Sequence, residues 1–207
     1  MQHSLQFQRK GQGSCPLSLV YSRLLVPESE KEAIEEMIVE LIKEYKFGDP
    51  RDPDVIVGPL ANQDQFEKVK SYIQKGIDEG ARVLLGELPQ ESYGYYVKPV
   101  VFTDVDNKME IAQNEIFGPV LSIISYGSVD EAIEIANNTV YGLSGAVFGD
   151  FDEAYEVATK IRTGTLVINS GNQLHRAPFG GFKHSGFGRE GGKFGLDEFV
   201  EVKALFV

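Results

Sequence analysis

The feature that most constrains the fold of this 207-residue chain is an alternation of apolar runs and amphipathic stretches in its second half. The apolar runs are typical of buried strands and occupy Val120–Tyr126, Leu143–Phe148 and Thr165–Asn169. A helix is predicted after each of the first two runs, one opening with a capping box of Ser128 and Glu131 and one spanning Asp152–Ile161. Strands that alternate with helices predict the α/β class, here a parallel-rich open sheet flanked by helices.

Two further amphipathic helices are predicted upstream of this region. The first has apolar residues at helical spacing, Ser29 as the expected N-cap and Gly48 as the expected stop. The second ends near Gly80, and two short strands are predicted after it, at Arg82–Leu85 and around Val100–Phe102.

The two ends of the chain differ from this pattern. Residues 1–10 show no helical or strand period and are expected to be a disordered or non-native start. Near the other end, a glycine-rich stretch leads into Glu198–Phe206, which is predicted to be a terminal strand. The expected organisation is therefore one compact domain over residues 11–196, followed by an arm over residues 197–207.

Composition and charge exclude several classes of partner. The formal net charge of −11 opposes binding to phosphate backbones, so no nucleic acid is expected as a partner. No apolar run approaches the roughly 20 residues that cross a bilayer, and the start does not resemble a signal peptide, so no membrane partner is expected. Cys15 is the only cysteine, which excludes an internal disulfide and a cysteine-based metal cluster; no metal site is predicted. A lone thiol without an export signal favours a reducing, cytoplasmic location.

The glycine-rich stretch contains Gly186-Phe-Gly188-Arg-Glu-Gly191, which fits the dinucleotide fingerprint G-x-G-x-x-G. That motif holds a pyrophosphate only when it joins a strand to the N-terminus of a helix. No predicted strand precedes Gly186, so tight packing of loops is the better interpretation of these glycines.

Longer motifs resemble those of the aldehyde dehydrogenase family. Pro178–Glu190, with the sequence PFGGFKHSGFGRE, is similar to the family's P-F-G-G-x-K-x-S-G-x-G-R-E. Four other motifs occur in the family's order: Gly58–Leu60 (G-P-L), Glu115–Val120 (E-I-F-G-P-V), Asn138–Leu143 (N-T-x-Y-G-L) and Gly164–Asn169 (G-x-x-x-I-N). The resemblance runs from about Gly11 to the C-terminus. It implies the family's catalytic-domain fold over residues 11–196 and identifies the chain as resembling the C-terminal portion of such an enzyme.

The resemblance also implies a chemistry, the oxidation of a small-molecule aldehyde to a carboxylate with NAD or NADP through a cysteine thioester. Cys15 would be the nucleophile. Glu115 would accept hydrogen bonds from ribose hydroxyls, Phe117 would pack beside the nicotinamide, and Gln65 matches a position that touches a cofactor ribose in some relatives. Without the resemblance, Phe117 would be interpreted as a core residue and Glu115 as a surface carboxylate.

In the family, the loop after the last predicted strand lines the path of the aldehyde. This resemblance makes five residues candidate substrate contacts: Asn169, Ser170, Asn172, Leu174 and His175. Taken alone, His175 would be interpreted as a solvated loop residue. The terminal strand corresponds to the family's oligomerisation strand, which pairs with a neighbouring subunit, so a homo-oligomer is expected.

The nucleophile segment departs from the family pattern, in which the cysteine lies in G-Q-x-C with an arginine five residues beyond. Here the sequence is Gly11-Gln-Gly-Ser-Cys15, so counting from the glutamine places Ser14 at the nucleophile's position. Counting back from Arg23 places Ser18 there instead. Cys15 is the only thiol within reach, and a thiol is a better nucleophile than an unassisted serine.

In the family, most of the nucleotide-binding domain, the glutamate general base and an oxyanion-holding asparagine lie upstream of G-Q-x-C. A second interpretation is therefore a catalytically inactive domain that serves only in assembly or binding. A third interpretation keeps the enzyme class but replaces water with coenzyme A as the acceptor. The sequence does not separate NAD from NADP or identify the aldehyde.

Overall fold

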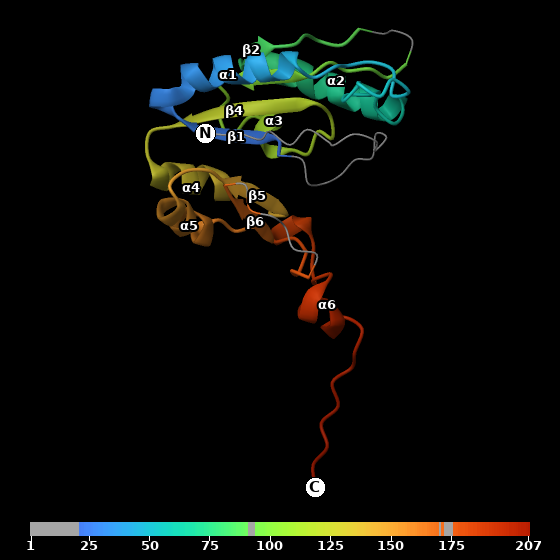
Figure 1. The fold of residues 1–207 in the computed structure, drawn as a ribbon, viewed down its shortest axis with the longest axis vertical. Helices are drawn as coiled ribbons and strands as arrows, with labels where there is room; N and C mark the ends of the chain where they lie inside the picture. The colour runs from blue at the N-terminus through green and yellow to red at the C-terminus, as the bar shows by residue number, and fades with distance from the viewer. Residues whose placement is uncertain (1–20, 91–93, 170, 172–175) are drawn as a thin grey trace. The chain divides into compact units, whose positions relative to one another are not determined.

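A computed structural model describes residues 21–90, 94–169, 171 and 176–207 of the chain (Figure 1). The chain divides into two compact units, Met1–Ala132 and Ile133–Val207. The domain boundaries expected from the sequence, with an arm over residues 197–207, stay a prediction. None of the helices formed by the described residues is long and apolar enough to cross a membrane.

The first unit is built on a four-stranded sheet with the strand order β1-β4-β3-β2. The strands are β1 (Arg23–Pro27), β2 (Arg82–Leu85), β3 (Val100–Thr103) and β4 (Val120–Tyr126). β4 pairs in parallel with both β1 and β3, whereas β2 pairs antiparallel with β3. Every residue of β3 and the first five of β4 are buried, as expected for central strands covered on both faces.

Helices cover the two faces of this sheet. The 3₁₀ turn η1 (Glu28–Glu30) leads into α1 (Lys31–Lys43), whose Ile38 and Ile42 pack in one core cluster with Val101 of β3. Side chains of successive strand residues point to opposite faces, so Phe102 points away from α1. Its ring lies against α2 (Gln63–Asp78) near Gly76, together with Ile111 of the short helix α3 (Glu110–Gln113).

The second unit contains a strand–helix–strand arrangement. It begins within α4 (Val129–Asn137) and continues through β5 (Ser144–Val147), α5 (Phe151–Lys160) and β6 (Thr165–Ile168), with β5 and β6 paired in parallel. The last helical segments are η2 (Lys183–Ser185) and α6 (Gly192–Asp197).

The α/β class and its parallel-rich pairing are confirmed, but the strands lie in two sheets. The alternation from β4 to β6 predicted one sheet, and that expectation is wrong for the described residues. β4 pairs with β1 along Ser122–Tyr126 and with β3 along Val120–Ser122, so a neighbouring strand already lies at each of its edges. The amphipathic pattern identified the strands and could not specify their neighbours.

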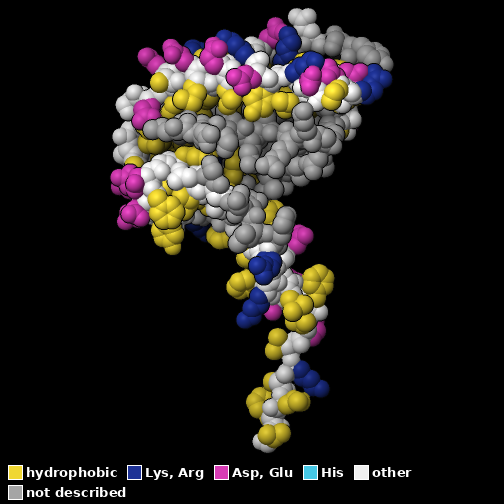
Figure 2. Space-filling model, viewed as in Figure 1, with side chains coloured by type: hydrophobic (Ala, Val, Ile, Leu, Met, Phe, Trp, Pro, Cys, Tyr) yellow, Lys and Arg dark blue, Asp and Glu magenta, His cyan; other side chains and the backbone are white. Residues whose placement is uncertain are grey.

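Two local predictions are also corrected. Ser29 is not the N-cap of α1: it lies inside η1, and the cap position is Glu30, without a side-chain cap hydrogen bond. Glu198–Phe206 forms no strand in the single chain. Its apolar side chains are exposed, including Phe199 at 87% and Phe206 at 97%, and Figure 2 shows them along this segment. A strand needs a hydrogen-bonded neighbour, and the described residues of the single chain provide none here.

Candidate functional site

The first unit positions a candidate site through the N-terminal turn of α2. Asn62 caps this helix, and its side-chain oxygen accepts a hydrogen bond of 2.8 Å from the backbone nitrogen of Gln65. The side-chain amide of Gln65 then donates to two successive carbonyl oxygens, that of Ile116 at 2.8 Å and that of Phe117 at 2.9 Å. The Asn62 cap therefore positions Gln65, and Gln65 in turn binds the segment that precedes β4.

The backbone of this segment has an uncommon conformation. Phe117 has a φ of 56°, in the left-handed region that costs a residue with a Cβ about 1–2 kcal/mol. Its neighbours hold it there, because Ile116 is buried at 3% exposure and Gly118 lies tight against Val69. A Cβ on Gly118 would come within 2.5 Å of a methyl group of Val69, so only glycine fits without a shift of the helix.

The result is a pair of side chains displayed at the surface. Phe117 is 37% exposed and is not the core residue that its type alone suggests, while Glu115 is exposed. The ammonium of Lys68 lies 5.2 Å from the centre of the Phe117 ring, within cation–π range. A carboxylate can accept hydrogen bonds from ligand hydroxyls, and an aromatic face can pack against a flat ring.

The structure thus brings together three of the sequence-predicted residues, Gln65, Glu115 and Phe117. Asn169 belongs to the second unit, at the end of β6. Its φ is 53°, its backbone nitrogen donates to the carbonyl of Val147 at 2.8 Å, and its side-chain oxygen accepts from the backbone nitrogen of Gly149 at 3.0 Å. This oxygen therefore holds the loop between β5 and α5. The remaining candidates lie outside the described residues: Cys15, Ser170, Asn172, Leu174 and His175.

The glycine-rich motif at 178–190 packs against the motif at 138–143. The backbone nitrogen of Phe182 donates to the carbonyl of Gly142 at 2.8 Å, and the hydroxyl of Ser185 accepts from the nitrogen of Gly142 at 2.9 Å. The residues before Gly186 form the η2 turn and not a strand, so the dinucleotide interpretation fails. A Cβ on Gly188 would meet the Glu198 carboxylate at 2.9 Å, whereas a Cβ on Gly186 would meet no atom within 4 Å, so tight packing accounts for Gly188 and not for Gly186.

Lys183 also joins these two motifs, a role that the sequence did not predict. Its ammonium donates to the carbonyls of Asn137 at 2.8 Å and Thr139 at 3.0 Å, at the C-terminus of α4. A cation there satisfies carbonyls left open by the helix and complements its dipole. The lysine inside the P-F-G-G-x-K motif was the available signal.

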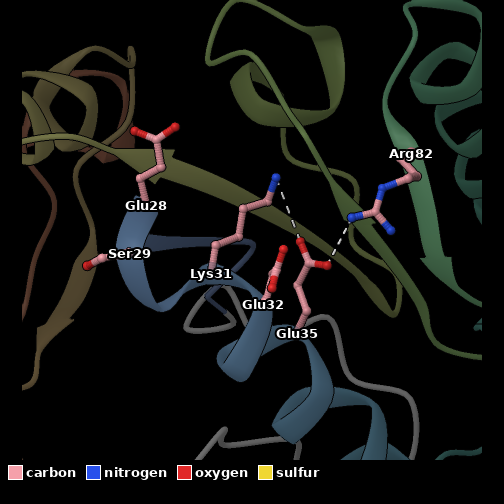
Figure 3. Close-up of a pocket in the computed structure, with 6 residues that line it drawn as sticks. All are labelled: Glu28, Ser29, Lys31, Glu32, Glu35 and Arg82. Carbon is pink, nitrogen blue, oxygen red and sulfur yellow. Dashed lines mark hydrogen bonds and ion pairs between the residues drawn. The ribbon is translucent and has the colours of Figure 1, made fainter.

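A separate charged network joins α1 to β2 and β3. The carboxylate of Glu35, which is 7% exposed, accepts hydrogen bonds from the buried hydroxyl of Thr103 and, at 2.9 Å, from Arg82. Lys31 pairs with the same carboxylate at 3.8 Å and with Asp104, which also accepts from Arg82 at 2.8 Å. Figure 3 shows the side chains of Lys31, Glu35 and Arg82 converging. They line a hollow of about 300 Å³ together with the exposed Glu28 and Glu32. Among the described residues, none of the predicted site residues lines this hollow, and its ion pairs join α1 to β2 and β3.

This network predicts a loss of stability in acid. Hydrogen bonds from Lys31 and then Arg82 hold the pKa of Asp104 below its ordinary value of 3.8. Because the folded pKa lies below the unfolded one, the stabilisation is complete above about pH 4 and disappears as the pH falls through the folded pKa. Asp104→Asn should therefore lower the free energy of unfolding by up to about 1 kcal/mol at pH 6 and by progressively less below pH 4.

Urea unfolding of both proteins across this pH range measures the difference. Asn tolerates the left-handed φ of 56° at position 104, so the exchange removes the charge without backbone strain. Asp54→Asn, which removes an exposed carboxylate of the same unit outside this network, is the control. An Asp104→Asn difference that grew toward pH 3 would contradict the assignment.

The chain matches the aldehyde dehydrogenase family over residues 6–205. A predicted aldehyde dehydrogenase of Staphylococcus saprophyticus is 46% identical over 188 residues, which are 89% of this chain and 40% of that protein. A solved structure of an aldehyde dehydrogenase C variant from Pseudomonas syringae, crystallised with NAD+ and octanal, has a TM-score of 0.85 at 41% identity and covers 89% of this chain and 39% of its own. Mycobacterium tuberculosis aldehyde dehydrogenase with NAD+ has a TM-score of 0.82 at 43% identity, covering 86% of this chain and 38% of its own.

This chain belongs to the aldehyde dehydrogenase family. It spans about 40% of the length of the curated relatives that it matches.

Proposed function

We propose that this chain is the cysteine-bearing part of an NAD(P)-dependent aldehyde dehydrogenase, which oxidises an aldehyde to a carboxylate through a cysteine thioester. The observation that carries the proposal is the segment 115–118. It has the family's E-I-F-G sequence, and it exposes a carboxylate and an aromatic ring two residues apart in sequence.

These residues fit the nicotinamide end of the cofactor. Glu115 is exposed and can accept hydrogen bonds from two ribose hydroxyls, and the exposed ring of Phe117 offers a flat apolar surface for the nicotinamide. Gln65 belongs to the same group through its contacts with Ile116 and Phe117. When bound, NAD(P)+ supplies the acceptor for the hydride that leaves the substrate carbon.

Cys15 is the proposed nucleophile. Its thiolate adds to the aldehyde carbonyl carbon and forms a carbon–sulfur bond. Once that carbon has been oxidised, water displaces the same sulfur, giving a carboxylate and regenerating the thiolate. Ser14 and Ser18, which the two counts along the family motif select, are the competing assignments.

The other proposed features concern substrate and assembly. Ser170, Asn172, Leu174 and His175 remain proposed substrate contacts, with Asn169 holding the start of their loop through Gly149. Pairing of residues 197–207 with a second copy of the chain, and a cytoplasmic location, are proposals of the same kind.

A second candidate function is an assembly or binding domain without turnover of its own. It is favoured by one observation, that the 188 matched residues cover 40% of the relative's length. We therefore expect the 207-residue chain to give no NAD(P)H when it is incubated alone with NAD+ or NADP+ and a panel of aldehydes. Steady turnover by the chain alone would contradict this expectation.

A fusion protein tests the leading proposal. Residues 11–207 are joined to the part of the S. saprophyticus relative that this chain does not match, and NAD(P)H formation is followed with the same aldehydes. Turnover is expected, and Cys15→Ser should reduce it on the order of 10³-fold or more. Ser14→Ala and Ser18→Ala are the matched controls and should retain activity. A folded fusion that binds NAD+ yet oxidises no aldehyde would overturn the proposal, and turnover that survives Cys15→Ser would remove Cys15 from it.

A further inference from the structure

The N-terminal turns of α2 contact the segment 116–118 through one face, formed by Gln65, Lys68 and Val69. Residues three and four apart lie on the same side of a helix, so these three side chains form a continuous surface. Gln65 hydrogen-bonds two carbonyls, Lys68 lies over the Phe117 ring, and Val69 packs against Gly118. Each of the three helix residues thus makes a different kind of contact with the segment.

The bonds of Gln65 depend on the helical, here left-handed, conformation of Phe117 and would not form on an extended backbone. In an extended chain successive carbonyls point to opposite sides, whereas a residue in a helical region, right- or left-handed, turns them toward the same side. With a φ of 56° at Phe117, the oxygens of Ile116 and Phe117 both lie within 2.9 Å of the same nitrogen. A primary amide carries two N–H donors and can therefore satisfy both oxygens at once.

We propose that Gln65 is a positioning residue for the nicotinamide end of the site: through the carbonyls of Ile116 and Phe117 it holds the left-handed backbone that aims the Phe117 ring. The inference rests on the proposed function for the identity of the ligand, but the positioning itself is a property of the free chain. Gln65 acts through its donor nitrogen on the protein backbone and not through its acceptor oxygen on a ribose.

Two substitutions separate these roles because they keep opposite halves of the amide. Gln65→Lys keeps N–H donors and has no acceptor, whereas Gln65→Glu keeps acceptor oxygens and has no donor when ionised. Positioning through the backbone requires the N–H donors. Gln65→Lys should therefore keep the left-handed conformation of Phe117, and Gln65→Glu should disrupt it. Direct contact with ribose hydroxyls through the acceptor oxygen would give the opposite order.

The first measurement uses the full 207-residue chain without cofactor. A single 4-fluorophenylalanine replaces Phe117, and its fluorine resonance reports the environment of the ring. We expect a sharp resonance at the unsubstituted position in Gln65→Lys, and a shifted or broadened one in Gln65→Glu and in the similarly shaped Gln65→Met. Thermal unfolding of each variant verifies that the first unit stays folded. An unchanged resonance in folded Gln65→Glu and Gln65→Met would overturn the proposal.

The second measurement uses the fusion protein described above. Gln65→Glu should raise the dissociation constant for NAD+ about tenfold, equivalent to about 1.4 kcal/mol, and Gln65→Lys should change it less than about threefold. Retained affinity in Gln65→Glu with lost affinity in Gln65→Lys would contradict positioning and favour direct ribose contact. If the fusion binds no NAD+ at all, the proposed function fails while the fluorine result still decides the role of Gln65.

Discussion

Gly164→Ala is expected to unfold the second unit of the chain. A Cβ on Gly164 would lie 1.6 Å from the carbonyl oxygen of Gly180 and 3.3 Å from that of Leu143. Both neighbours are backbone atoms, so no side-chain rotation relieves the overlap. Two hydrogen bonds join these segments at the carbonyl oxygen of Gly142. The backbone nitrogen of Gly164 donates to it at 3.0 Å, and that of Phe182 donates to it at 2.8 Å. Separating these segments would break both bonds. We therefore expect the free energy of unfolding of the second unit to fall by at least about 4 kcal/mol.

Hydrogen–deuterium exchange of the full chain, followed in peptides from residues 140–168, measures this loss within the second unit. Gly149→Ala is the matched control, because a Cβ there meets no atom within 4 Å and the bond from its backbone nitrogen to Asn169 is kept. Peptides 140–168 should exchange almost at the rate of an unfolded chain in Gly164→Ala and at the wild-type rate in Gly149→Ala. Equal protection in the two variants would show that the segments can separate at little cost.

Local patterns in the sequence predicted single elements, whereas contacts between distant segments were not predictable from such patterns. The helices and strands between Val120 and Ile168 were predicted within one or two residues, because alternating apolar patterns, the Ser128–Glu131 cap and punctuating glycines are local signals. The pairing of strands was not predictable in the same way. β4 joins β1, which lies about 100 residues earlier in the chain, and only the hydrogen-bonded register reveals that both of its edges are occupied.

The same distinction between local patterns and distant contacts applies to the candidate site. Glu115 and Phe117 were predicted by resemblance of a contiguous motif, although residue type alone placed Phe117 in the core. The structure adds contacts between residues that are distant in sequence. The Gln65 amide donates to carbonyls more than 50 residues away, and the Lys183 ammonium donates to a carbonyl at the end of α4. Such side-chain-to-backbone contacts leave no periodic pattern, so they appear only in three dimensions.

Phe102→Ala is expected to cost the first unit about 3–5 kcal/mol, the range for truncating a buried aromatic residue. Phe102 is fully buried in the central strand β3, and its ring reaches so close to α2 that a Cβ on Gly76 would meet it at 3.0 Å. Truncation would leave a cavity under the helix that carries Gln65 and Lys68. We therefore expect the Phe117 segment to lose protection together with the core.

Urea unfolding, combined with hydrogen–deuterium exchange of peptides from residues 63–78 and 115–126, measures both effects. Phe102→Leu retains most of the apolar volume and should cost less than about 1.5 kcal/mol. Phe151→Ala removes a ring that is 62% exposed on α5 and stacks on Tyr155, and it should change the free energy of unfolding by about 1 kcal/mol at most. If Phe102→Ala lost stability while peptides 115–126 kept their protection, the Phe117 segment would depend on the contacts of α2 itself and not on how the sheet supports that helix.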